Sequence, residues 1–133
     1  MNVLIDSSVL IALFDTEDKF HKRAITEMTK LYIRGNKSWI SEHVLDEVLN
    51  ILLKRNMIKK ISILIQNIQE GNIFVFTPET SNSIKIRNSV IKLLINQGKK
   101  RASFTDLYSV VLINDEYIIG SRILSFDKHH KSE

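Results

Sequence analysis

The sequence predicts an α/β fold of three layers, α/β/α, in which a central parallel sheet of four to five strands is flanked by helices. Short apolar runs alternate along the chain with longer segments in which apolar residues recur at helical spacing. Most of these runs are apolar throughout rather than at alternate positions, which is typical of parallel strands that are covered on both faces. With 133 residues and no internal repeat, the chain predicts a single domain over residues 1–133.

The predicted elements follow one another in a regular order. Apolar runs bounded by turn residues predict strands at 2–5, 37–40, 73–76 and 121–126. Apolar residues three and four positions apart predict helices at 9–14, 19–34, 42–55, 58–70, 79–96 and 106–117. Boundary residues support these limits, because Gly35 and Gly71 end helices, Ser41 is a suitable cap and Pro78 suits a helix start.

The composition excludes several classes of protein. Hydrophobic residues make up 44% of the chain and charged residues 26%, as in an ordinary globular protein. The longest uncharged stretch, 61–69, is far shorter than the roughly 18 apolar residues that a membrane span requires. Asp6 interrupts the first apolar run, so the N-terminus does not resemble a signal peptide. The absence of cysteine excludes disulfides and thiolate metal sites, and we expect a cytoplasmic protein.

The net charge of +4 favours an anionic substrate such as nucleic acid. The alternative is that a lysine-rich coding bias makes the protein basic without any functional meaning.

Two aspartates directly follow predicted strands. Asp6 ends the apolar run 3–5, and Asp127 ends the run 123–126. In open α/β sheets, ligands bind beyond the carboxyl ends of the strands where the strand order reverses, so these carboxylates approach each other if the first and last strands are neighbours. The alternatives are that Asp6 caps the following helix, although Ser7 or Ser8 could do so equally, and that Asp127 is a turn residue paired with Lys128.

Two further acids belong to helices. Glu47 stands between Val44 and Ile51 on the apolar side of its helix, so we expect it to project toward buried surface. Asp106 begins a helix that is apolar nearly all round, with Ser103 or Thr105 available as its cap. The alternative for Glu47 is that it lies at the boundary of the apolar face and reaches water. The alternative for Asp106 is that the helix dipole alone favours an acid in the first turn.

Together these four carboxylates predict a metal-dependent phosphoryl-transfer site. Carboxylates hold Mg²⁺ or Mn²⁺ ions, which activate water and stabilise the leaving oxygen, so no protein nucleophile is required. The sequence contains no P-loop, dinucleotide glycine fingerprint or Ser-His-Asp grouping.

The chain resembles the PIN-domain family, and within it the VapC-type ribonuclease toxins. The matching segments, in the family's order and near its spacing, are 3–14, 41–49, 104–106 and 123–127. The resemblance implies a parallel sheet with the first strand in the centre, and a ribonuclease that uses Mg²⁺ or Mn²⁺. It implies that Asp6, Glu47, Asp106 and Asp127 are the catalytic, metal-binding acids. Supporting roles fall to Ser7, Thr105 and Ser125.

The resemblance also implies partners. Toxins of this type usually form homodimers and are inhibited by a cognate antitoxin, a segment of which occupies the active-site groove. Basic residues that we expect to guide RNA are Arg55, Lys99, Lys100 and Arg101, although the loop 97–101 can equally be a solvated charge run. Two features depart from the family. Lys128-His129-His130 stands where an aromatic residue is usual, and no apolar run remains after it for a final strand.

The sequence therefore predicts a metal-dependent endoribonuclease, the toxin of a toxin–antitoxin pair. Three alternatives stay open. The first is a PIN-fold module that binds RNA or protein without cleaving. The second is a PIN nuclease of ribosomal RNA processing, and the third is a small metal-dependent phosphohydrolase.

Overall fold

The computed structural model describes residues 1–99 and 102–127. In chain order its elements are β1 (Asn2–Ile5), α1 (Ser7–Phe14), α2 (His21–Ile33), β2 (Lys37–Ser41), α3 (Glu42–Lys54), α4 (Ile58–Gln69), β3 (Phe74–Phe76), α5 (Thr80–Asn96), α6 (Phe104–Asn114) and β4 (Ser121–Leu124).

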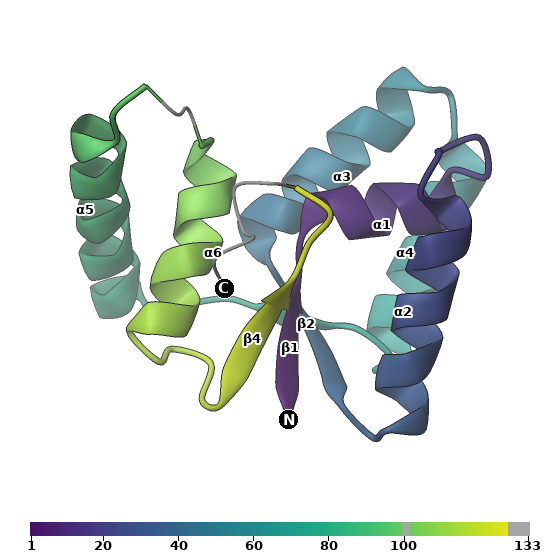
Figure 1. Ribbon diagram of the computed structural model, residues 1–133, viewed down its shortest axis with the longest axis horizontal. Coiled ribbons are helices and arrows are strands. Elements are labelled where there is room, and N and C mark those ends of the chain that lie inside the picture. The colour runs from purple at the N-terminus through teal and green to yellow at the C-terminus, as the bar shows by residue number, and fades with distance from the viewer. Residues whose placement is uncertain (100–101, 128–133) are drawn as a thin grey trace.

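The four strands of the described residues form one sheet in the order β3-β2-β1-β4, and every neighbouring pair is parallel. The register pairs Leu4 with Trp39 on one side of β1 and with Ile123 on the other. The first strand is therefore internal to the sheet, and the last strand lies directly beside it (Figure 1). The predicted parallel sheet is confirmed.

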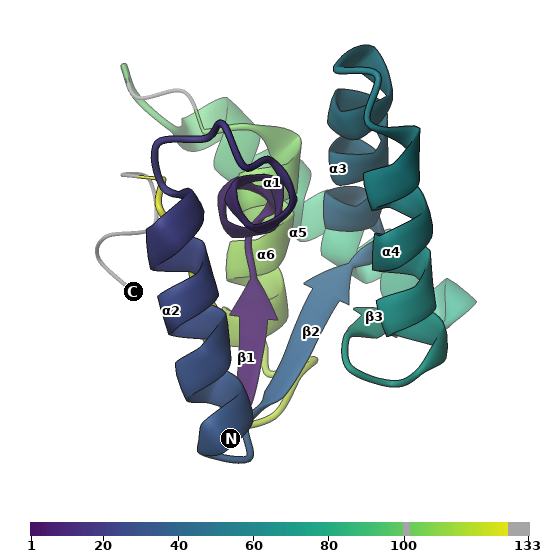
Figure 2. The same ribbon diagram turned by 90° about the vertical axis from the view of Figure 1, so that its right-hand side faces the viewer.

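Helices cover both faces of this sheet, which gives the three predicted layers. On one face Val3 and Ile5 pack into a core with residues of α1, α2, α3 and α4. On the other face Leu4 packs against α5 and α6. Figures 1 and 2 show α2 and α4 on one side of the strands and α5 and α6 on the opposite side. Because β1 is covered on both faces, all of its core positions have to be apolar.

Several element boundaries differ from those predicted. Helix α6 ends at Asn114 rather than residue 117, and α2 begins at His21 rather than Lys19. Three other differences occur where a side chain takes over a backbone hydrogen bond. Helix α1 begins at Ser7 rather than Val9 because Asp6 is its N-cap, and α6 begins at Phe104 because Ser103 caps it. Strand β4 ends at Leu124 rather than Phe126. The backbone N–H groups of Phe126 and of the following residue bond to serine hydroxyls instead of continuing the ladder.

No helix among the described residues has both the length and the apolar character needed to span a membrane.

The central strand makes a direct test of this packing possible. Leu4 is 0% exposed, so Leu4→Ala removes buried methyl groups and leaves a cavity, which we expect to lower the free energy of unfolding by about 2–5 kcal/mol. Leu53, on α3, is 55% exposed, and Leu53→Ala is the matched control with an expected loss below about 1 kcal/mol. Urea unfolding of both variants measures the difference. Equal losses would contradict the central position of β1.

Candidate active site

Among the strands of the described residues, the strand order of the sheet reverses at one point. From β1 the chain adds β2 and then β3 on one side, and it returns to place β4 on the other side of β1. Ligands of open parallel sheets bind beyond the carboxyl ends of the strands at such a point. Asp6 follows β1 there, and the segment 125–127 follows β4. The sequence-based condition that the first and last strands are neighbours is therefore met.

Asp6 is 2% exposed and lies at the centre of a hydroxyl network. Its Oδ2 accepts hydrogen bonds from Ser8 Oγ at 2.8 Å and from Ser125 Oγ at 2.9 Å. The same oxygen accepts from the Ser8 backbone N–H at 3.4 Å, which makes Asp6 the N-cap of α1. A carboxylate buried this deeply needs such donors, because desolvation of its charge is otherwise unfavourable. Asp6 is thus both a helix cap and a residue of the reversal point.

The two serines of this network also fix the segment after β4. Ser125 Oγ accepts from the Asp127 backbone N–H at 2.9 Å, and Ser8 Oγ accepts from the Phe126 backbone N–H at 3.1 Å. Ser125 therefore contacts both aspartates of the predicted site, one through its carboxylate and one through its backbone. The ends of the first and last strands are held together by side chains as well as by the ladder.

Glu47 lies on α3 and is partly buried, as its position beside Val44 predicts. Its Oε1 accepts a hydrogen bond of 2.6 Å from Ser7 Oγ, and Ser7 is 6% exposed at the first position of α1. This bond holds the carboxylate of Glu47 at the N-terminal end of α1, one residue from Asp6.

Asp106 is 8% exposed and lies in the first turn of α6. It forms a capping box with Ser103, whose backbone N–H donates to Asp106 Oδ2 at 3.2 Å and whose Oγ accepts from the Asp106 N–H at 3.1 Å. The His43 ring lies 4.4 Å from the Tyr108 ring and 5.2 Å from the Phe104 ring, between centroids. These contacts bring the starts of α3 and α6 together on the side to which the strands point (Figure 1).

The predicted acids are thus joined in part. Asp6 and Asp127 share Ser125, and Glu47 is tied to the N-terminal end of α1 through Ser7. Within residues 1–99 and 102–127, no group of three or more Asp, Glu or His side chains is close enough to hold a metal ion. Mg²⁺ does not need one, because it usually takes one or two carboxylates together with water and substrate phosphates. The carboxylate oxygens present fit a hard divalent cation.

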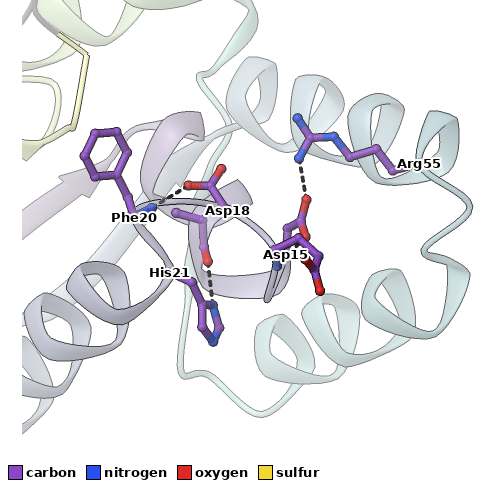
Figure 3. Close-up of polar contacts among 7 residues, drawn as sticks. Asp15, Asp18, Phe20, His21 and Arg55 are labelled. Carbon is purple, nitrogen blue, oxygen red and sulfur yellow. Dashed lines mark hydrogen bonds and ion pairs between the residues drawn. The ribbon is translucent and has the colours of Figure 1, made fainter.

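The predicted basic residues have different surroundings. Arg55 forms an ion pair of 2.7 Å with Asp15 (Figure 3) and lines a groove of about 540 Å³ that also contains Asp127. Lys99 is exposed in the loop before α6. Lys100, Arg101 and the segment Lys128-His129-His130 lie outside the described residues.

Several residues of this region had no clear signal in the sequence. Ser8 was visible only as a possible cap, yet its hydroxyl contacts both Asp6 and the segment after β4. The sequence offers Thr105 as an alternative cap for α6, but that role belongs to Ser103, and the Thr105 carbonyl accepts from Ser109 Oγ at 3.3 Å. His43 could have been suspected from its place one helical turn before Glu47, although its aromatic partners are more than 60 residues away in sequence.

Burial raises the pKa of Tyr108, on α6, from its ordinary value of 10.0 to about 12, and the Glu42 carboxylate adds to the rise. Tyr108 therefore stays neutral throughout the physiological range.

Comparisons with known proteins agree with this architecture. The family model for the PIN domain matches residues 3–130. Among solved structures, the toxin VapC20 of Mycobacterium tuberculosis, described as cleaving the sarcin-ricin loop, has a TM-score of 0.78 to this chain. The match covers 98% of this chain and 93% of that chain at 18% sequence identity, so the likeness is one of fold. Among curated proteins, none matches the sequence significantly.

The hydroxyl network has a measurable contribution to stability. Ser8→Ala removes a donor to the buried Asp6 carboxylate and an acceptor for a backbone N–H, so we expect a loss of about 1–3 kcal/mol in the free energy of unfolding. Ser62, exposed on α4, gives the control Ser62→Ala, with an expected change within about 0.5 kcal/mol. Urea unfolding compares the two, and indistinguishable midpoints would contradict the role of Ser8.

Tyr108 gives a prediction for pH. Because its pKa is raised on folding from 10.0 to about 12, its contribution to stability is complete below pH 10.0 and is lost as the pH rises to about 12. Spectrophotometric titration of tyrosinate is expected to show a late transition that Tyr108→Phe abolishes. Tyr32→Phe, which changes a tyrosine that is 83% exposed, leaves that transition in place. A late transition that survives in Tyr108→Phe would contradict this prediction.

Proposed function

Because the chain belongs to the PIN domain family, we propose that it is a metal-dependent endoribonuclease and the toxin of a toxin–antitoxin pair. Two comparisons support the proposal: the PIN model matches nearly the whole chain, and the fold is that of a toxin described as cleaving the sarcin-ricin loop. We do not assign the sarcin-ricin loop to this chain as its target. We propose only RNA as its class of substrate.

One observation carries the proposal. Asp6 and Asp127, from opposite ends of the chain, are joined through Ser125 at the reversal point of the sheet. This is where parallel sheets bind ligands, and two acids in segments that are held together at that point are suited to a cation. A purely structural role as a helix cap would not require the second acid.

The residues that would hold Mg²⁺ or Mn²⁺ are Asp6, Glu47, Asp106 and Asp127. A bound ion of this kind lowers the pKa of a coordinated water molecule and offsets the charge that develops on the phosphate. The protein's own contribution is orientation. Ser7 fixes the Glu47 carboxylate, and Ser125, together with Ser8, fixes that of Asp6. Thr105 would support the start of α6 beside Asp106.

Binding of RNA would draw on the net charge of +4. Arg55 borders the groove beside Asp127, and Lys99, Lys100 and Arg101 precede, in the sequence, the helix that carries Asp106. We further propose that the protein acts in the cytoplasm, forms a homodimer and is inhibited by an antitoxin protein.

A second candidate is a PIN-fold module that binds RNA or protein without cleaving. The observation that favours it is the lack, among the described residues, of three acidic or histidine side chains grouped closely enough for a metal ion.

The test is cleavage of a mixed RNA pool by the full chain with Mg²⁺ or Mn²⁺, with EDTA, and by Asp6→Asn. We expect EDTA to abolish cleavage and Asp6→Asn to lower its rate by about 100-fold or more, equivalent to roughly 2.7 kcal/mol. Asp46→Asn, an exposed acid beside Glu47, is the control that retains activity.

Two other outcomes would decide against the proposal. Equal activity of Asp6→Asn and the unaltered protein would remove Asp6 from the site. No cleavage by folded protein with either metal would favour the binding module.

A further inference from the structure

The groove beside Asp127 is built from parts of the chain that are distant in sequence. Its volume is about 540 Å³, within the range of roughly 300–1,000 Å³ in which proteins bind small ligands. Three segments line it besides the end of α3: the first turns of α1, the loop between α1 and α2, and the residues after β4. The lining residues with polar or aromatic side chains include Ser8, Lys19, Phe20, Arg55, Phe126 and Asp127.

Two aromatic rings from different ends of the chain form one wall of the groove. The centroids of Phe20 and Phe126 are 5.3 Å apart, with their planes at 44°. Cations accompany both rings, since Lys19 Nζ is 5.0 Å from the Phe20 centroid and the Arg23 guanidinium is 4.5 Å from that of Phe126. Arg23 contacts Phe126 without lining the groove. Both rings are partly buried against the core and partly accessible.

Polar contacts hold the loop that carries Phe20 in place (Figure 3). The Asp18 carboxylate accepts from the Phe20 backbone N–H at 2.8 Å, and His21 Nδ1 lies 2.8 Å from the Ala12 carbonyl oxygen. The ion pair of Arg55 with Asp15 ties the loop to α3. In Figure 3 the Phe20 ring points away from these contacts. A wall fixed in this way loses little conformational freedom when a ligand binds.

We propose that this groove binds one unpaired nucleotide of the RNA substrate, next to the phosphodiester bond that is cleaved. The base lies against Phe20 and Phe126, and its phosphate faces Lys19 and Arg55. The assignment rests on the proposed nuclease function, because Asp127 connects the groove to the metal-binding acids.

The chemistry of the groove favours an unpaired nucleotide over other ligands. Aromatic faces accept any base by stacking, but a base within a duplex already has both faces covered by its neighbours. An apolar peptide would use the rings but not the cations beside them. Of the two acids that line the groove, Asp18 accepts a hydrogen bond from the Phe20 backbone N–H, which offsets part of its negative charge.

The test measures binding of a fluorescein-labelled, single-stranded oligoribonucleotide to the full chain in EDTA by fluorescence anisotropy. A second oligomer of equal length and charge carries riboses without bases. Phe20→Leu keeps an apolar side chain but removes the ring, and we expect it to bind the base-bearing oligomer roughly 5- to 100-fold more weakly. Binding of the abasic oligomer is expected to stay unchanged.

Matched variants separate stacking from general effects. Phe20→Trp keeps an aromatic face and is expected to bind within about twofold of the unaltered protein. Tyr32→Leu removes an exposed aromatic ring of α2 outside the groove and is expected to have no effect. The proposal would be overturned by equal loss for both oligomers, by no loss in Phe20→Leu, or by duplex RNA binding as tightly as the single strand.

A charge variant covers the case in which Phe20→Leu does not fold. Lys19→Gln removes one phosphate contact, so the slope of log affinity against log salt concentration is expected to become shallower by about 0.7. Lys22→Gln, an exposed lysine of α2 that does not line the groove, leaves the slope unchanged. An unchanged slope in Lys19→Gln would overturn the assignment.

Cleavage assays on the same proteins distinguish the two proposals. Metal-dependent cleavage without any effect of Phe20→Leu on binding would reject the nucleotide groove and keep the nuclease. Base-dependent binding through Phe20 without cleavage under Mg²⁺ or Mn²⁺ would reject the nuclease and keep a single-strand RNA groove.

Discussion

Strand β1 is the constraint on which the rest of the structure depends. It is paired on both edges, with β2 and β4, and covered on both faces, so that Val3, Leu4 and Ile5 are all 0% exposed. Asp6 directly follows this strand, so its side chain is also buried, with 2% exposure. A carboxylate at that depth has to be supplied with donors by the elements that meet there. The beginning of α1 and the segment after β4 supply these donors, and the same hydrogen bonds hold both segments in place.

Asp6 Oδ2 accepts from hydroxyl and backbone N–H groups of Ser8 and Ser125. Such donors orient a carboxylate and replace its lost hydration without adding positive charge. The bond from Ser7 to Glu47 follows the same principle on α3.

The groove beside Asp127 has a different physical basis. Its Arg55–Asp15 ion pair is partly exposed, with side-chain exposures of 45% and 14%, and pairs of this kind contribute only about 0–1 kcal/mol to stability. The main effect of this ion pair is positional, because it connects the α1–α2 loop to the end of α3. The aromatic contact between Phe20 and Phe126 similarly joins that loop to the end of β4. The loop is thus anchored on both sides of the groove.

The sequence by itself determined the α/β class, the order of the elements and most of their limits, because uninterrupted apolar runs, helical periodicity and caps are local signals. It also marked Asp6 and Asp127 as acids that follow strands, although their roles as metal ligands stay predictions. The starts of α1 and α6 and the end of β4 were wrong by two residues, since at each of them a side chain takes over a backbone hydrogen bond. The end of α6 was wrong by three residues and the start of α2 by two. Only the tertiary structure decided which residues meet. Ser8 with Phe126, His43 with Tyr108, and Phe20 with Phe126 are contacts across 65 or more residues, and nothing in the local sequence of either partner specifies the other. The two contacts of Phe126 arise because parallel pairing of β1 with β4 brings the segments that follow these two strands together. The contact of His43 with Tyr108 arises where the start of α3 meets α6.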